Sequence, residues 1–516
     1  MFLPGVAILC VLCLLSACGN NAIADDVRLS LAAVPAAAPA RGVLVAPPLL
    51  QSTMSATPLP MQRQVNLSVT GRVLGRIGAL DCDVSAYRIQ YGSVGARGEA
   101  ILASAALMVP GGRGAACSGP RPMLLYAHGT STDRDFNIAD LGEGRNAEGL
   151  IVATFFVARG YIVVAPDYAG LGASTLPYHP YLNADQSSRD MMDALAAARS
   201  ALPTLAAAIS DDDRLYLTGY SQGAHVALAT QRALQAAGMT VTAAAPMSGP
   251  YALASFLDAI YAGQVNSGAT VHMTLLMTSY QRAYGDVYAR PAVAYDAAYV
   301  DGIETLLPST QPRSALYAAG RLPHYALFSS TPPPGFAAQT PAAQPAAYSA
   351  QFARAFGARP LIANSYRLAY LQDMSAHPDA ATARHPLRRA AHRNDLRGFR
   401  PTAPTLLCGG AGDPTVYWFN SQLLAGDGVT LLDLDSPAAG DDPHASLKRA
   451  FSAAKALVAA AAVARGADDG GAAAVLDAYH STLVPPFCLA AVRDFFVAHE
   501  RDQRVAGTAA GPPQRR

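Results

Sequence analysis

Ser221, Asp413 and His480 are residue types that can together turn a serine hydroxyl into a nucleophile. Ser221 stands in Gly219-Tyr220-Ser221-Gln222-Gly223, a G-x-S-x-G pattern with an apolar stretch before it and a helix-forming stretch after it. A serine hydroxyl needs a base to take its proton and a carboxylate to orient that base. Because an aspartate and a histidine follow in the chain order that such sites use, we expect a Ser221–His480–Asp413 triad.

The G-x-S-x-G pattern has physical meaning only when a strand, a tight turn and a helix carry it. Residues 215–218 are predicted to form the strand, and a helix is predicted from Ala224. A sharp bend crowds the neighbouring backbone, which favours glycine on both sides of the serine. The Gln222 amide would open the helix unpaired, and with an amide of the loop at Thr130 it would bind a developing oxyanion.

The acid has competitors in the sequence. Asp413 follows the predicted strand of residues 404–408, in a glycine-rich loop at the edge of the sheet where such an acid is expected. Asp433 and Asp435 fall within a predicted strand, and Asp395 precedes the last strands. Asp413 is therefore the preferred candidate.

The base is the harder choice, because His444 and His480 both follow the acid. His444 comes soon after the last predicted strand, where the simplest sheet of this kind would carry the base. His480 comes later, before Pro485-Pro486 and a final helix. We prefer His480, since a disulfide between Cys408 and Cys488 would tie its segment to the strand that carries Asp413.

Four cysteines remain after the N-terminal ones are set aside. An even number in an exported chain indicates two disulfides, although four cysteines allow three pairings. We expect the pairs Cys82–Cys117 and Cys408–Cys488. Because none of these four cysteines forms a C-x-x-C pair and the sequence contains no H-E-x-x-H, we expect no metal and no cofactor.

Strand-like and helix-like stretches alternate through much of the chain, which predicts an α/β fold with a mostly parallel central sheet. The alternation stops after Pro250 and resumes near residue 404. An insertion there predicts a large, partly helical cap over the carboxyl edge of the sheet. The predicted parts are a signal peptide (1–18), a disordered tether (19–62), the first core part (63–250), the cap (251–399), the second core part (400–500) and a disordered tail (501–516).

The set of motifs resembles the α/β-hydrolase superfamily, and within it the bacterial relatives of the secretory lipases. It comprises His128-Gly129, Pro166-Asp167-Tyr168, the Ser221 turn, Cys408-Gly-Gly-x-x-Asp413-Pro-Thr-Val and Tyr479-His480 with its following Pro-Phe-Cys488. The resemblance covers residues 123–250 and 404–498 and implies hydrolysis of carboxylic esters. The substrate would be a small-molecule or lipid ester. The alternatives are a serine peptidase of the same fold and a binding lipoprotein without catalysis.

Residues 1–18 form an apolar stretch of signal-peptide length that is too short for a stable membrane anchor. Leu15-Ser16-Ala17-Cys18 resembles a lipobox, in which Cys18 becomes the lipidated first residue. Cleavage after Ala22-Ile23-Ala24 is the alternative and would give a secreted or periplasmic protein. We expect an exported protein held at the bacterial envelope, with the outer membrane favoured, by a lipid anchor only. The net charge of +1 gives no indication of a nucleic-acid partner.

Overall fold

The computed structural model describes residues 39–56, 80–142, 146–205 and 208–509 of the chain. The predicted signal peptide, Cys18 and most of the predicted tether lie outside the described residues. The described residues all belong to one compact unit.

A nine-stranded sheet organises this unit, in the order β1-β2-β3-β5-β4-β6-β7-β10-β11. The first three strands pair antiparallel with their neighbours, and all pairs from β5 to β11 are parallel. The sheet is therefore mostly parallel, as the alternation predicts, and it agrees with the α/β-hydrolase fold that the resemblance implies. The strands are β1 (Leu49–Met54), β2 (Asp83–Val94), β3 (Ala100–Gly111), β4 (Gly119–Ala127), β5 (Ile162–Pro166), β6 (Ile209–Tyr220), β7 (Ala243–Met247), β10 (Thr405–Gly409) and β11 (Val429–Asp433).

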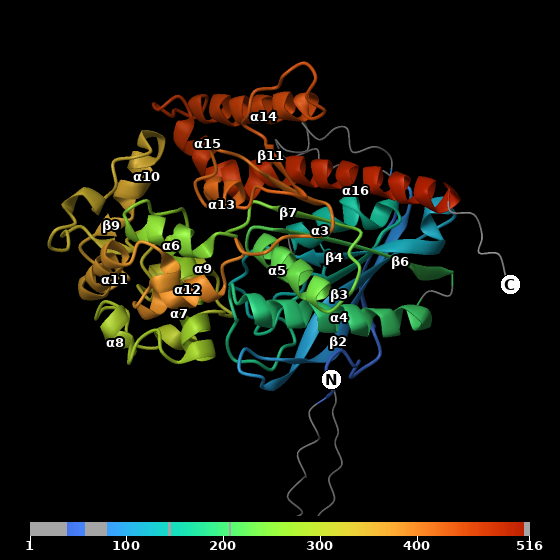
Figure 1. Ribbon diagram of the computed structural model, residues 1–516, viewed down its shortest axis with the longest axis horizontal. Helices are drawn as coiled ribbons and strands as arrows, with labels where there is room; N and C mark the ends of the chain where they lie inside the picture. The colour runs from blue at the N-terminus through green and yellow to red at the C-terminus, as the bar shows by residue number, and fades with distance from the viewer. Residues whose placement is uncertain (1–38, 57–79, 143–145, 206–207, 510–516) are drawn as a thin grey trace, which may run out of the picture. The chain divides into compact units, whose positions relative to one another are not determined.

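Helices cover both faces of the sheet, as a parallel sheet requires (Figure 1). Alternate side chains of β4 show the two faces: Leu124 and Tyr126 join one hydrophobic core, while Met123 and Leu125 join the other. The first core also contains α3, α14 and α16, and the second contains α4 and α5. These helices, with two short ones, are α3 (Ala147–Phe155), α4 (Ala184–Leu205), α5 (Gln222–Ala236), α13 (Phe419–Gln422), α14 (Ala445–Val463), α15 (Ala472–Ala478) and α16 (Val484–Ala509).

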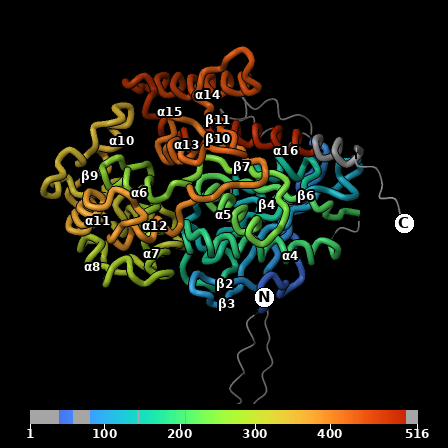
Figure 2. The backbone as a smooth tube through the Cα atoms, in the orientation of Figure 1, coloured from blue at the N-terminus to red at the C-terminus, as the bar shows by residue number. Residues whose placement is uncertain are grey.

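A helical region stands between β7 and β10, which are themselves neighbours in the sheet. In Figures 1 and 2 it lies to one side of the sheet, in yellow-green to orange, and it has its own hydrophobic core. Its β8 (Phe328–Ser329) and β9 (Phe356–Gly357) pair only with each other. Its helices are α6 (Leu253–Tyr261), α7 (Ala269–Tyr284), α8 (Pro291–Ala294), α9 (Arg313–Ala318), α10 (Ser349–Arg354), α11 (Asn364–Ala376) and α12 (Pro386–Arg393).

Two segments expected to be disordered are regular where the structure describes them. Within the predicted tether, β1 adds to the sheet beside β2, and Arg41 forms an ion pair with Asp193 at 3.0 Å. Within the predicted tail, α16 continues to Ala509. The tether prediction overlooked a short edge strand whose partner is distant in sequence. The tail prediction overlooked that no proline occurs between Pro486, in the first turn of the helix, and Pro512.

Two disulfides join the cysteines in the expected pairs, Cys82–Cys117 and Cys408–Cys488. The second links β10 to the first turns of α16. Large apolar side chains of α16 such as Phe487, Val492 and Phe496 are at most 1% exposed. Each such burial contributes about 1.5–3 kcal/mol. The helical run Ala472–Glu500 is apolar and long enough to cross a membrane, but about half of its most apolar window is buried in the protein, as in a core helix.

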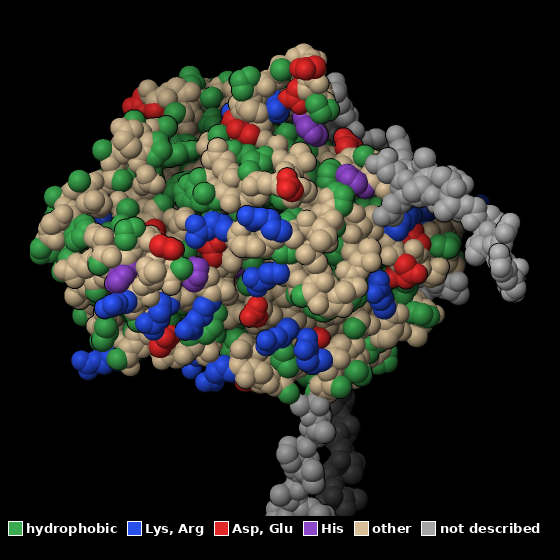
Figure 3. Space-filling model, in the orientation of Figure 1, with side chains coloured by type: hydrophobic (Ala, Val, Ile, Leu, Met, Phe, Trp, Pro, Cys, Tyr) green, Lys and Arg blue, Asp and Glu red, His purple; other side chains and the backbone are tan. Residues whose placement is uncertain are grey.

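Basic side chains gather on the face drawn in Figure 3, around the position of α12 in Figure 1, with acidic side chains among them. On α12, Arg388 is buried and pairs with Asp258 and Asp373, each at 2.8 Å. Arg389 pairs with Asp286 at 2.8 Å. Carboxylates therefore offset part of the positive charge on this face.

Candidate active site

Ser221 occupies a strained turn between the end of β6 and the start of α5. Its φ of 57° and ψ of −118° are rare for a residue with a side chain, and the surrounding packing must hold them. A Cβ at position 223 would lie 1.9 Å from the Ala127 carbonyl oxygen, and one at position 219 would lie 2.4 Å from the Gly223 oxygen. Glycine is thus required on both sides for the turn to pack against β4.

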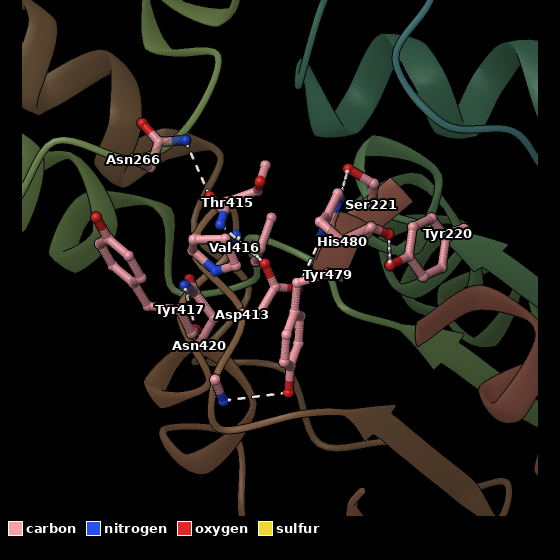
Figure 4. A network of polar contacts seen from close by, with 12 residues as sticks. Tyr220, Ser221, Asn266, Asp413, Thr415, Val416, Tyr417, Asn420, Tyr479 and His480 are labelled. Carbon is pink, nitrogen blue, oxygen red and sulfur yellow. Dashed lines mark hydrogen bonds and ion pairs between the residues drawn. The ribbon is translucent and has the colours of Figure 1, made fainter. Parts of the chain in front are cut away.

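Ser221, His480 and Asp413 lie in one hydrogen-bonded chain (Figure 4). His480 Nδ1 donates to Asp413 Oδ2 at 2.7 Å, and Nε2 lies 2.9 Å from Ser221 Oγ. Because Nδ1 faces a carboxylate, the ring proton is held there. Nε2 is left to accept the serine proton, which is the arrangement of a hydroxyl, its base and an orienting acid.

Asp413 is buried and its carboxylate is fully engaged. It is 1% exposed, in the loop that follows β10. Its Oδ1 accepts from the backbone amides of Thr415 at 2.8 Å and Val416 at 3.0 Å, which leaves Oδ2 for the histidine. These bonds fix the carboxylate in the orientation that His480 needs.

His480 lies in a π-helical turn, Tyr479–Leu483, between α15 and α16. Tyr220 donates to the His480 carbonyl, and the Tyr479 hydroxyl accepts from the Gly412 amide at 3.2 Å (Figure 4). Tyr479 also donates to Asp435. The turn is thereby bound to both the serine turn and the acid loop, and the Cys408–Cys488 disulfide ties the helix behind it to β10.

The competing acids and base have other partners. Asp433 accepts from the Ala411 amide at 2.9 Å, and Asp395 forms an ion pair with Arg397 at 2.8 Å. Asp435 pairs with Lys455. His444 precedes α14, where its own amide donates to Asp442 at 2.8 Å. None of the four has a hydrogen bond to Ser221 or His480 among the described residues.

The two predicted oxyanion donors border Ser221 from different elements. Gln222 is the first residue of α5, where an amide has no partner within the helix. Thr130 follows β4, and its hydroxyl lies 3.1 Å from the Tyr181 hydroxyl. Thr130 and Ser221 line the same cleft, and no hydrogen bond to the Thr130 amide is found among the described residues. Both amides are therefore available to a ligand at Ser221.

Ser221 opens onto two hollows. The first, the apolar pocket, extends between the sheet and the cap and also contains Gln222 and His272. Burial lowers the pKa of His272 to about 4, so its ring is neutral at pH 7. The walls of the apolar pocket come mainly from α6 and α7: Leu253, Phe256, Leu257, Ile260, Met273 and Leu276.

The second hollow, the Glu148 cleft, lies on the His480 side of Ser221 and carries charged groups. It is lined by Thr130, Glu148, Arg313 and Ser481 besides Ser221 and His480. Burial raises the pKa of Glu148 above its ordinary value. Glu148 could not be predicted from the sequence, because neither a motif nor a spacing marks it. Tyr220 and Tyr479 were visible only as neighbours of Ser221 and His480.

Among the residues that the structure describes, no group of three or more His, Cys, Asp or Glu side chains could hold a metal ion. The polar groups at Ser221 are instead those of acyl transfer: a hydroxyl, an imidazole, a carboxylate and free amides.

Known proteins share this fold and part of this sequence. The secretory lipase family matches residues 145–241. The chain is 25% identical to a ligand-bound form of the rice cell wall degrading esterase LipA from Xanthomonas oryzae, with a TM-score of 0.62 over 88% of this chain and 98% of that one. A Legionella pneumophila protein shares the fold at 19% identity, with a TM-score of 0.60 over 88% and 98% of the two chains. A search of curated proteins gives no match.

The family match contains the serine turn and α5, and the structural match to the esterase extends over nearly the whole described chain. The nine-stranded sheet agrees with both. The chain therefore has the α/β-hydrolase fold and is similar to secretory lipases and to an esterase.

Proposed function

We propose that this protein hydrolyses carboxylic esters through a Ser221–His480–Asp413 triad and an acyl-enzyme. The observation that carries the proposal is the hydrogen-bonded chain from Ser221 Oγ through His480 to Asp413, with contacts of 2.9 and 2.7 Å. Likeness to the secretory lipases and to an esterase supports the ester as the bond that is cleaved.

Ser221 Oγ attacks the ester carbonyl carbon while His480 Nε2 takes the hydroxyl proton. Asp413 holds the ring and stabilises the imidazolium. The amides of Gln222 and Thr130 donate to the oxyanion of the tetrahedral intermediate. As the C–O bond of the ester breaks, His480 gives its proton to the departing alcohol. Water, activated by the same histidine, then releases the acid and restores Ser221.

The two hollows suggest how an ester would lie. The side chains of α6 and α7 in the apolar pocket suit the hydrocarbon part of an acyl group, whose burial is worth about 0.8 kcal/mol per CH₂. The alcohol part would then occupy the Glu148 cleft, beside the histidine that protonates it. A p-nitrophenyl ester series from acetate to palmitate tests this placement, since the rate should rise with chain length until the pocket is full.

Ser221→Ala tests the function itself. We expect kcat for p-nitrophenyl butyrate to fall about 10⁶-fold, as for a nucleophile that acts within a triad. The wild-type protein should also react with a fluorophosphonate probe at Ser221. Undiminished hydrolysis by Ser221→Ala would contradict the proposal, and a wild-type serine that does not react would point to the binding lipoprotein.

The protein is also proposed to be exported and lipid-anchored at Cys18. Two buried disulfides support an oxidising compartment, and the secretory lipase likeness supports export. The lipobox-like Leu15–Cys18 supports the anchor. Metabolic labelling with an alkyne fatty acid should mark the wild-type protein and not Cys18→Ala. Equal release of both proteins into the medium would instead indicate ordinary signal cleavage.

A further inference from the structure

One carboxylate beside Ser221 takes no part in the proton relay. Glu148 stands in the first turn of α3, and its Oε1 accepts from the Gly129 amide at 2.9 Å and from the Tyr126 hydroxyl at 2.7 Å. Burial raises the pKa of Glu148, against the lowering effect of these two hydrogen bonds. A carboxylate in this setting costs stability unless its contacts compensate, so its role needs an explanation.

A contribution to the stability of α3 does not explain why the Glu148 carboxylate is buried. The cap of the helix is Asn146, whose side chain accepts from the Gly149 amide at 2.9 Å. An acidic residue in a first turn adds only about 0.3–1 kcal/mol through the helix dipole, and a side chain turned to solvent would do this equally well. Glu148 instead reaches across to the end of β4.

Glu148 holds the amide of Gly129, the residue immediately before Thr130. The sheet fixes the chain as far as Ala127, which pairs with Gly219 in β6. Beyond it, Tyr168 donates to the His128 carbonyl at 2.9 Å, and the Glu148 carboxylate takes the Gly129 amide. The Gly129 carbonyl in turn lies 2.6 Å from His128 Nδ1. Without the Glu148 acceptor, only the contacts of Tyr168 and His128 would hold the two peptide bonds around a glycine that has no Cβ to restrict it, directly before the Thr130 amide.

We propose that Glu148 is a positioning residue, which holds the Gly129 amide so that the Thr130 amide faces the oxyanion formed at Ser221. The inference rests on the proposed function. It differs from a contact with the substrate, because the group that Glu148 acts through is the loop backbone. What the loop requires is an acceptor at Oε1, and a neutral acceptor would satisfy it.

Two substitutions at position 148 distinguish a need for a hydrogen-bond acceptor from a need for a negative charge. Glu148→Gln keeps an oxygen for the Gly129 amide, while Glu148→Ala removes it. We expect E148A to lower kcat for p-nitrophenyl butyrate about 10- to 100-fold with KM within about twofold, somewhat less than the loss of an oxyanion donor itself. E148Q should remain within about threefold of wild type, because a neutral amide oxygen still accepts.

A transition-state mimic provides the second readout. An aliphatic trifluoromethyl ketone forms a tetrahedral oxyanion adduct on the serine, so E148A should weaken its binding by about the same factor as kcat. The matched control is Glu304→Ala in the cap, where a glutamate accepts from the Tyr288 hydroxyl at 2.9 Å. That variant should keep the wild-type kcat. Active sites are counted by fluorophosphonate labelling, so that unfolded protein does not enter kcat.

Three results would overturn the inference: an E148A variant as fast as wild type, equal losses in E148A and E148Q, or a change in KM alone. Equal losses would mean that the charge matters, and a KM effect would mean a substrate contact. If E148A does not fold, Glu148→Asp replaces it, since a side chain one methylene shorter does not reach the Gly129 amide. A wild-type Ser221 that does not react with the probe would instead contradict the proposed function.

Discussion

The serine turn and the acid–base segment meet at one site but are held by opposite means. The serine turn, residues 219–223, is short, strained and packed backbone against backbone, with Ser221 at a φ of 57°. The acid–base segment, residues 410–416 and 479–483, is unstrained and is held by side chains. His480 reaches partners 67 and 259 positions away in the sequence.

This difference teaches where each half is vulnerable. Close packing admits no added atom at the serine turn, whereas the acid–base segment depends on a few hydrogen bonds and one disulfide. Substitutions should therefore harm the first by steric conflict and the second by loss of a partner. Four predictions probe that contrast.

Asp413→Asn should have the largest effect, because it breaks the acid–base segment at its centre. An amide in place of the carboxylate favours the wrong histidine tautomer, and kcat should fall about 10⁴-fold. Ester hydrolysis with a folded, fluorophosphonate-titrated variant measures it. The control is Asp433→Asn, whose oxygen still accepts from the Ala411 amide. An equal loss of kcat in Asp433→Asn would contradict the assignment of Asp413 as the acid.

Removing the Cys408–Cys488 disulfide should come next. Both bridges close long loops, with separations of 80 and 35 residues, and each loss should lower the free energy of unfolding by about 4 kcal/mol. Only Cys408→Ser/Cys488→Ser should also lower kcat, because that bridge anchors the His480 turn. Both double variants are compared by denaturant unfolding and by kcat at 20 °C. The variant Cys82→Ser/Cys117→Ser is the control. Equal kcat in both double variants would refute the anchoring role.

Gly223→Ala should break the serine turn. The added methyl would meet the Ala127 carbonyl oxygen at 1.9 Å, and relieving that conflict should cost about 3 kcal/mol of unfolding free energy. Urea unfolding measures it. At Gly440 a Cβ meets nothing within 4 Å, so Gly440→Ala should be close to neutral. Wild-type stability in Gly223→Ala would mean that the turn is less tightly packed than its contacts indicate.

Tyr479→Phe should give the smallest effect, because the ring stays and only the hydroxyl is lost. The Gly412 amide and Asp435 each lose a partner, and a hydrogen bond is worth about 0.5–1.5 kcal/mol net. We expect a loss in kcat of about 3- to 10-fold, measured with p-nitrophenyl butyrate. Tyr325→Phe, at a cap tyrosine that is 51% exposed, should leave kcat unchanged. An unaltered rate in Tyr479→Phe would leave the disulfide as the main support of the turn.

The alternation of strands and helices was readable from the sequence because each element carries its own pattern. The strand before Ser221 was predicted at residues 215–218, inside the longer β6 (Ile209–Tyr220), and the helix after it was predicted to begin two residues late. The strand β10 was located by its apolar run before the glycines. The edge strand β1 was missed, because its partner β2 is too distant for a local pattern to show the pairing. The extension of α16 was missed because polar residues there were taken for a disordered tail.

The sequence by itself determined the serine turn, since five consecutive residues and their flanking strand and helix contain all that the bend requires. Only the tertiary structure decided which histidine lies against Ser221, because the sequence favoured His480 over His444 solely through an expected disulfide. The role of Glu148 was likewise visible only in the tertiary structure. No motif marks this residue, and its contact with the Gly129 amide exists only once α3 packs beside β4. A turn is a local property of the chain, whereas a hydrogen bond between distant segments depends on the whole packing.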